Sequence, residues 1–205
     1  MLILASSSPR RRELLAQAGL AFIVEPSDID EELMAGEAAA AFVQRLALEK
    51  AQAVCALHIS KSGGSTPCAV LAADTAVVLP DGTVLGKPTS PIDATRMLTL
   101  LSGRTHAVMT GLAVVTCGPQ SRTLADVEIT QVTVNLISQD EIASYVATGE
   151  PLDKAGAYAI QGYAARWIPR IEGDYFNVVG LPIARVVSML SELGISTRAD
   201  RSSSI

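Results

Sequence analysis

The 205-residue sequence contains no long hydrophobic run, which argues against an integral membrane protein. The longest apolar stretches, residues 68–73 and 109–116, are much shorter than the roughly 20 residues that span a bilayer. A signal peptide is not expected either, because the arginines at positions 10–12 follow the first apolar run instead of preceding it. These absences predict a cytoplasmic protein that does not associate with membranes.

Cysteine and histidine are scarce as well. The three cysteines, Cys55, Cys68 and Cys117, are widely spaced and form no CxxC pair, so neither a structural zinc site nor a disulfide framework is expected. The two histidines, His58 and His106, have no second ligand at helical or hairpin spacing. We therefore interpret each histidine as a surface or packed residue.

Positive charge is also in short supply. The chain has 16 lysines and arginines against 21 aspartates and glutamates, which gives a net charge of −5. This balance argues against binding nucleic acid, because sequence-independent binding requires a broad basic face. An anionic ligand would therefore need positive charge that is concentrated locally.

The composition that remains is that of a folded protein. Hydrophobic residues make up 49% of the chain, far more than a disordered chain carries. We assign residues 1–196 to one domain, which could be divided into two lobes, and residues 197–205 to a flexible tail.

Residue periodicity predicts a mixed α/β fold with antiparallel strands in its second half. Strands are expected at residues 1–5, 20–24, 68–73, 76–79, 84–85, 105–116, 122–136 and 167–171, and helices at residues 9–18, 38–57, 91–101, 138–147 and 181–193. Residues 60–67 are interpreted as a flexible connection, and the glycine-rich residues 149–162 as a long loop.

Local signals support several of these elements. Ser8 precedes Pro9 as an N-cap, and Ser138 is followed by Glu141 at capping-box spacing. An Asp-Gly pair at 81–82 predicts a hairpin. In the long helix at 38–57, the expected inward residues are Phe42, Leu46 and Ala53, while Arg45, Glu49 and Lys50 are expected off that stripe.

The first candidate site is the segment from Ser6 to Arg12, at a strand-to-helix turn. Free backbone N–H groups, hydroxyls and guanidinium groups together would bind a phosphate. The alternative is an ordinary N-cap followed by solvated arginines, and the spacing alone favours neither interpretation.

The second candidate is Asp74, which follows a buried apolar strand and precedes Thr75. At the carboxyl end of such a strand, a carboxylate can hold a divalent cation or accept a proton from water. The alternative is an aspartate that only caps a turn. The hairpin signal lies later, at 81–82, so we favour the functional interpretation.

The remaining candidates are charged residues. Three of only four lysines, Lys50, Lys87 and Lys154, lie in or beside marked segments, and lysine suits phosphate oxygens. The acidic residues 28–32 could complete a magnesium shell together with phosphate oxygens. Ordinary surface lysines and a solvated acidic loop are the alternatives.

Several segments together resemble the Maf family of nucleoside triphosphate pyrophosphatases. They are LILASSSPRRRELL, LAADTAVV, LGKP, LSGRTHAVMTGLAVV, PLDKAGAYAIQG and FNVVGLPI. The resemblance extends from residue 1 to about residue 193. It implies an elongated twisted sheet flanked by helices, a ligand cleft between two lobes, a homodimer, and hydrolysis of a nucleoside triphosphate to the monophosphate and pyrophosphate.

The resemblance also implies roles for individual residues. Asp74 would be the proton acceptor, Glu31 and Asp74 would bind a divalent cation (Mg²⁺, Mn²⁺ or Co²⁺), and substrate choice would depend on Arg10, Thr75 and Gln161. The residues expected to contact substrate are Ser8, Arg10, Arg11, Lys50, Thr75, Lys87, Lys154 and Gln161.

The segment around Gln161 is similar to the branch of the family that acts on dTTP and UTP. The branch that acts on 7-methyl-GTP usually has a glutamate near this position. Ala159, where many relatives have glycine, departs from the pattern. A nucleotide-binding regulator of cell division without catalysis remains an alternative, whereas a P-loop kinase is not expected because GxxxxGK[ST] is absent.

Overall fold

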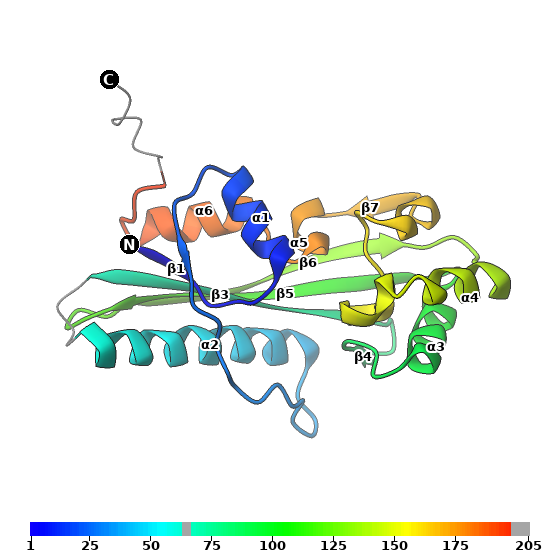
Figure 1. The fold of residues 1–205 in the computed structure, drawn as a ribbon, viewed down its shortest axis with the longest axis horizontal. Helices are drawn as coiled ribbons and strands as arrows, with labels where there is room; N and C mark the ends of the chain where they lie inside the picture. The colour runs from blue at the N-terminus through cyan, green and yellow to red at the C-terminus, as the bar shows by residue number, and fades with distance from the viewer. Residues whose placement is uncertain (63–66, 198–205) are drawn as a thin grey trace.

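The computed structural model describes residues 1–62 and 67–197 (Figure 1). In this part of the chain, seven strands form one sheet in the order β2-β1-β3-β5-β6-β7, and β4 pairs with β3. The strands are β1 (Leu2–Leu4), β2 (Ile23–Val24), β3 (Cys68–Val78), β4 (Val84–Leu85), β5 (Thr105–Cys117), β6 (Thr123–Thr133) and β7 (Arg170–Glu172). The helices are α1 (Pro9–Gln17), α2 (Ala39–Ser62), α3 (Pro91–Leu101), α4 (Gln139–Ala147), α5 (Tyr175–Val179) and α6 (Ile183–Glu192). Three 3₁₀ turns are η1 (Glu150–Asp153), η2 (Ala155–Ala157) and η3 (Tyr163–Trp167).

The sheet is mixed, as the sequence predicts. β1 is parallel to β2 and β3, whereas every other pairing is antiparallel. β3 is buried on both faces along most of its length, which explains its continuous apolar sequence. β5 and β6 form the long antiparallel pair predicted from their alternation.

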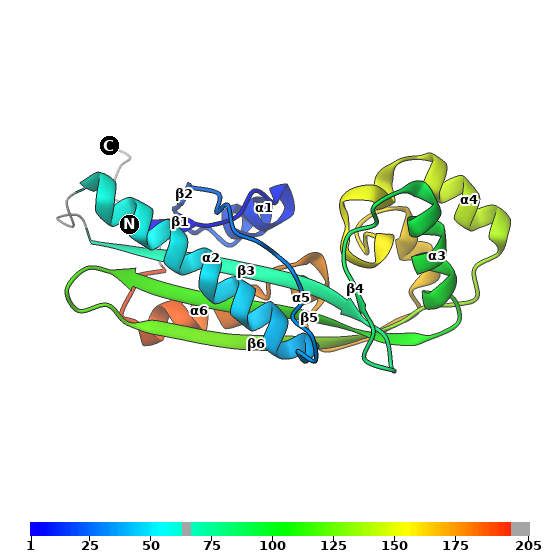
Figure 2. The same cartoon turned by 90° about the horizontal axis from the view of Figure 1, so that it is seen from below.

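Helices cover the sheet on both faces and at one end (Figures 1 and 2). α2 lies along one face, across β3, β5 and β6, and packs its apolar side against β3 and β5. α1 and α6 cover the opposite face, where a second cluster of buried residues forms. α3, α4 and the 3₁₀ turns surround the far end of the sheet around a third cluster. The molecule is therefore elongated, with helical layers at two separate parts of one sheet.

The predicted capping signals are present. The Ser8 hydroxyl accepts from a backbone N–H of α1, and Ser138 and Glu141 form a capping box at the start of α4. In the β3–β4 turn, the Asp81 carboxylate accepts from the N–H of Thr83, while Gly82 adopts a φ of +87°. Local sequence therefore determines where these elements begin and turn.

Several elements differ from the prediction. β2 contains two residues only, which pair with Ile3 and Leu4 of β1. α2 continues beyond the predicted end to Ser62, and Trp167 lies in η3 instead of a strand. α5 was not predicted. The predicted flexible connection and tail fall largely on residues 63–66 and 198–205, outside the described residues.

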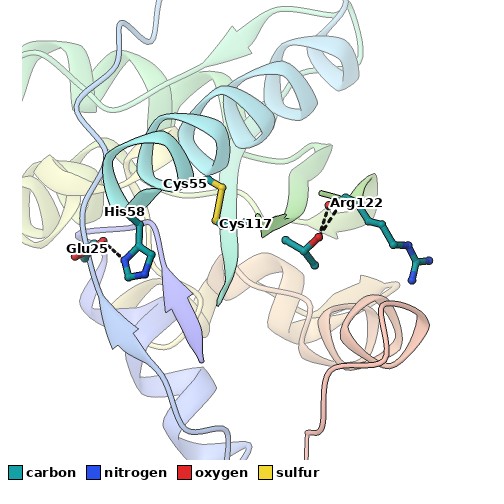
Figure 3. The surroundings of a disulfide bond; sticks show 6 residues. Glu25, Cys55, His58, Cys117 and Arg122 are labelled. Atoms are coloured by element: carbon teal, nitrogen blue, oxygen red, sulfur yellow. Dashed lines mark hydrogen bonds and ion pairs between the residues drawn. A yellow bond between two sulfur atoms is a disulfide. The ribbon is translucent and has the colours of Figure 1, made fainter. Parts of the chain in front are cut away.

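The prediction that the cysteines form no disulfide is wrong. Cys55 on α2 and Cys117 at the end of β5 form a disulfide, with their Cα atoms 5.8 Å apart (Figure 3). Sequence spacing conceals this pair, since 62 residues separate the two positions and only the packing of α2 on β5 unites them. Cys68 is buried and free, and it is the register partner of Cys117 on the neighbouring strand.

α2 approaches β5 closely at one glycine. A Cβ atom added at Gly111 would lie 2.1 Å from the backbone oxygen of Val43. No side chain fits in that space, so glycine sets the distance between this helix and the sheet.

Among the described residues, no helix is long and apolar enough to cross a membrane.

Candidate active site

A cavity of about 530 Å³ lies between the α1 region and the α3/α4 end of the sheet. Segments distant in sequence form its wall: the β1–α1 turn, the loop before α2, α2 itself, β3, the β4 region and residues 153–161. All ten residues selected from the sequence line it: Ser8, Arg10, Arg11, Glu31, Lys50, Asp74, Thr75, Lys87, Lys154 and Gln161. The fold thus brings them together, while their individual roles stay predictions.

The cavity borders an interruption in the pairing of β3. β1 pairs with β3 only as far as Leu4 and Leu71, and β4 begins to pair at Val77. Within the described chain, no strand covers this edge of β3 between the two points. Asp74 therefore lies inside a long strand and not at its end, which corrects the prediction. The strand that ends here is the neighbour, β1.

Side-chain alternation places Asp74 and Thr75 on opposite faces of the sheet. Asp74 contacts Lys50 on α2, whereas Thr75 contacts Arg11 on α1. Both residues line the cavity. The cavity therefore wraps around the open edge of β3 and receives side chains from both helical layers.

Lys50 lies between two carboxylates. Its Nζ is 2.6 Å from Asp74 Oδ1 and 2.6 Å from Glu31 Oε1. The residue is only 7% exposed, so its predicted position off the inward stripe of α2 is wrong. Ala53, which was expected to face inward, is exposed. A buried ammonium is tolerated at this position because two carboxylates pair with it.

Glu31 has a perturbed pKa. Burial by itself would raise this pKa, but the hydrogen bond from Lys50 and the charges of Lys87 and Arg11 hold it below the ordinary value. The side chain is 52% exposed. Glu31 therefore offers an ionised carboxylate to the cavity at neutral pH.

Arg11 connects α1 to the open edge of β3. Its Nε donates to the carbonyl of Gly180 at 2.8 Å. Its Nη1 donates to the carbonyl of Ala73 at 2.7 Å, and its Nη2 donates to the Thr75 hydroxyl at 2.9 Å. The interpretation of the arginine run as solvated therefore fails for Arg11, although Arg12 is exposed.

Thr75 belongs to a buried polar network that sequence reasoning missed. Its hydroxyl is 3.0 Å from that of Thr110, which also donates to the backbone oxygen of Asn177. The Asn177 amide donates to the backbone of Val108 and to the hydroxyl of Thr130, both at 3.0 Å. Asn177 could have been noticed as a polar residue inside the apolar segment FNVVGLPI.

A second set of charges in the cavity comes from α1 and from residues 153–154. Lys154 Nζ donates to Asp153 Oδ1 at 2.6 Å, and Arg10 Nη1 lies 3.5 Å from Asp153 Oδ2. The contact between Arg10 and Asp153 joins α1 to η1 at the cavity. Lys87 and Gln161 are exposed and line the same cavity. Asp153 was not selected from the sequence, although it lies in the quoted segment PLDKAGAYAIQG.

Positive charge predominates in the cavity of this acidic protein. Five cationic side chains face three carboxylates: Arg10, Arg11, Lys50, Lys87 and Lys154 against Glu31, Asp74 and Asp153. The excess suits an anionic ligand, and the fork geometry of arginine and the point charge of lysine both suit phosphate oxygens.

The prediction left open whether each histidine is a surface residue or a packed one; His106 is buried and His58 is half-buried. His106 is 1% exposed, and its Nε2 lies 2.9 Å from the hydroxyl of Tyr158, which lines the cavity. Burial lowers the pKa of His106 to about 4, so the ring is neutral at pH 7. His58 is half-buried beside Glu25 (Figure 3).

Glu31 and Asp74 are the side chains with which the cavity could hold a metal ion. The described residues contain no group of three or more His, Cys, Asp or Glu side chains arranged to do so. A magnesium-type ion, however, needs only one or two carboxylates when phosphate oxygens and water complete its shell. The donor set therefore fits a cation that binds together with a phosphorylated ligand.

Comparison with known proteins gives matches along almost the whole chain. A family model described as "Maf-like protein" matches residues 1–193. A Moorella thermoacetica protein named dTTP/UTP pyrophosphatase is 55% identical over 196 residues, which cover 95% of each chain. A Koribacter versatilis protein of the same name is 51% identical over 194 residues, again 95% of each chain. Among solved structures, a HAM1 protein from Coxiella burnetii has 15% identity and a TM-score of 0.48, covering 93% of this chain and 98% of that one.

Proposed function

The chain belongs to the Maf family, and we propose that it hydrolyses dTTP and UTP to the nucleoside monophosphate and pyrophosphate in the cavity described above. Other pyrimidine or modified uridine triphosphates are possible substrates, because one methyl group changes discrimination by only about 1–3 kcal/mol. The observation that carries the proposal is the contact of Lys50 with both Asp74 and Glu31 at the open edge of β3.

Glu31 and Asp74 are the proposed ligands of a divalent cation, which would be Mg²⁺, Mn²⁺ or Co²⁺. Oxygen ligands distinguish poorly among these ions, so the donor set does not select one of them. When bound, the cation would neutralise phosphate oxygens and polarise the phosphoryl group. The shared contact with Lys50 supports the assignment because it holds the two carboxylates close together.

Asp74 is the proposed general base for a water that attacks the α-phosphorus. Lys50 binds its Oδ1, so Oδ2 would receive the proton from the water. The water oxygen bonds to the phosphorus, and the bond from the α-phosphorus to the bridging oxygen breaks. Arg10, Lys50 and Lys87 would stabilise the negative charge that develops on the leaving pyrophosphate.

The other lining residues would bind and orient the substrate. Ser8 and Lys154 would contact phosphate oxygens, while Arg10, Thr75 and Gln161 would influence substrate choice. Arg11 donates three hydrogen bonds to Gly180, Ala73 and Thr75, so its contribution would be to position Thr75.

A panel of nucleoside triphosphates assayed with Mg²⁺ or Mn²⁺ tests this proposal. We expect pyrophosphate release from dTTP and UTP, and pyrophosphate and orthophosphate should be measured separately. Release of orthophosphate would identify a phosphatase instead. Tight binding without turnover of any nucleotide would favour the regulator of cell division.

Gln161→Glu should lower kcat/KM for dTTP by about 10- to 100-fold, which corresponds to roughly 1.5–3 kcal/mol. An amide can both donate to a pyrimidine carbonyl and accept from its ring N–H, whereas a carboxylate can only accept. The ratio of dTTP to GTP turnover measures the effect. Gln139→Glu, an exposed substitution at the start of α4, serves as the control. An unchanged ratio in Gln161→Glu would remove Gln161 from substrate choice.

A further inference from the structure

An arginine outside the cavity lining holds the segment that leads from Glu31 to α2. Arg45 Nε lies 2.7 Å from Glu37 Oε1, and Arg45 Nη2 lies 2.8 Å from Glu37 Oε2. The same Nη2 donates to the backbone oxygen of Glu32 at 3.0 Å. Arg45 therefore binds this segment at the Glu37 carboxylate and at the backbone of Glu32, the residue next to Glu31.

The Arg45–Glu37 contact is stronger than an ordinary surface ion pair. It is bidentate, and the side chains are only 21% and 10% exposed. Glu37 also accepts from the backbone N–H of Met34 at 3.1 Å, and Arg45 also contacts Glu49 one turn further along α2. The hydrogen bond from Arg45 lowers the pKa of Glu37, so this carboxylate stays ionised at neutral pH.

Side-chain contacts position this segment because no regular element does. The described residues 25–38 form no helix or strand, and only a turn interrupts them. Two α2 side chains hold consecutive residues of it: Lys50 binds the Glu31 carboxylate, and Arg45 binds the Glu32 backbone. A substitution of Arg45 therefore removes one of the two contacts that hold these consecutive residues, while the side chains of Lys50 and Asp74 themselves are unchanged.

We propose that Arg45 is a positioning residue: by fixing residues 32–37 on α2, its guanidinium sets the place of the Glu31 carboxylate in the cavity. This inference rests on the proposed function, in which Glu31 binds the divalent cation. Arg45 touches neither cation nor substrate. Arg45 affects how tightly the divalent cation binds. The chemical step itself does not depend on Arg45.

Arg45→Lys is the decisive variant, since lysine keeps the charge but cannot bind Glu37 through two parallel bonds. We expect the Mn²⁺ concentration for half-maximal dTTP hydrolysis to rise about 10-fold, as is typical when a partner behind a metal ligand is lost. The kcat at saturating Mn²⁺ should change little. Arg96→Lys is the control, because Arg96 also pairs with a nearby aspartate but lies on α3, far along the sequence from this segment.

A double-mutant cycle separates positioning from general structural support. In a Glu31→Gln background, Arg45→Lys should raise the Mn²⁺ requirement no further, because both changes act through the same carboxylate. A full additional effect in that background would overturn the proposal. So would a lower kcat and melting temperature with no change in the Mn²⁺ requirement.

Hydrogen exchange provides a measurement that does not depend on turnover. Amides of residues 32–37 should exchange faster in Arg45→Lys than in the wild type, while those of β3 and β5 stay unchanged. If amide exchange at residues 32–37 were unchanged, Arg45 would not fix this segment on α2. This result would overturn the proposal even if the wild type hydrolysed no nucleotide. Failure of the proposed function would appear differently, as a wild type that releases no pyrophosphate.

Discussion

Asp74→Asn should lower kcat for dTTP by about 10²- to 10⁴-fold, the usual range for removing a general base. Asparagine has almost the same shape and can still accept from Lys50, but it cannot take a proton from water. The KM should change much less than kcat, because the cationic side chains that would bind phosphate remain in place. Steady-state release of pyrophosphate, together with nucleotide binding by calorimetry, measures the two effects separately.

Asp140→Asn is a suitable control for this variant, since Asp140 is an exposed aspartate on α4. It should keep wild-type kinetics. Circular dichroism and thermal unfolding would establish that Asp74→Asn is folded. Wild-type turnover in a folded Asp74→Asn protein would end the assignment of Asp74 as the base.

Lys50→Met should reduce both activity and stability. Without the lysine ammonium, Asp74 and Glu31 lose the positive charge with which both of them pair. The Asp74 side chain is only 13% exposed, so its carboxylate would stay buried without a partner. Removing one partner of a buried pair costs about 3 kcal/mol, and the loss of a phosphate contact should lower kcat/KM by about 100-fold. Urea unfolding and dTTP kinetics measure these two losses.

The stability loss in Lys50→Met should depend on pH. The pKa of Glu31 is lowered in the folded protein, so its contact with Lys50 contributes fully above the unfolded value of about 4.3. This contribution to stability is lost as the pH falls through the lowered pKa of Glu31 in the folded protein. The difference in unfolding free energy between the wild type and Lys50→Met should therefore narrow below about pH 4.

Lys61→Met is the control for the same helix, because Lys61 is 59% exposed near the end of α2. It should lose little stability at any pH. If Lys50→Met were as stable as Lys61→Met at pH 7, the contacts of Lys50 would contribute nothing to the fold. A constant difference from pH 7 to pH 3 would show that the loss does not come from the carboxylates.

Local sequence determined where most elements begin and end. α3 has the predicted bounds, and the capping box of α4 and the turn between β3 and β4 are as predicted. These features depend on residues within a few positions of one another, so a pattern in the chain is sufficient to identify them. The sequence also pointed to ten residues that line one cavity, eight of which lie in the quoted segments.

Position within an element was predicted less well. Helix periodicity placed Lys50 off the inward stripe of α2, yet two carboxylates from other parts of the chain hold it in the interior. Asp74 was expected at a strand end, because the apolar run stops there. The strand continues through Asp74. The edge of β3 is uncovered there because β1 ends, and the sequence of β3 gives no sign of where its neighbour ends.

The sequence by itself determined the class of fold, the chain segments that line the cavity and the residue types available to them. Only the tertiary structure decided which side chains pair: Lys50 with Asp74 and Glu31, Arg45 with Glu37, and Cys55 with Cys117. The physical reason is that hydrophobic periodicity and capping act within a few residues. The cost of burying a charge or a thiol, in contrast, depends on partners that only the packing of α2 on the sheet brings into contact.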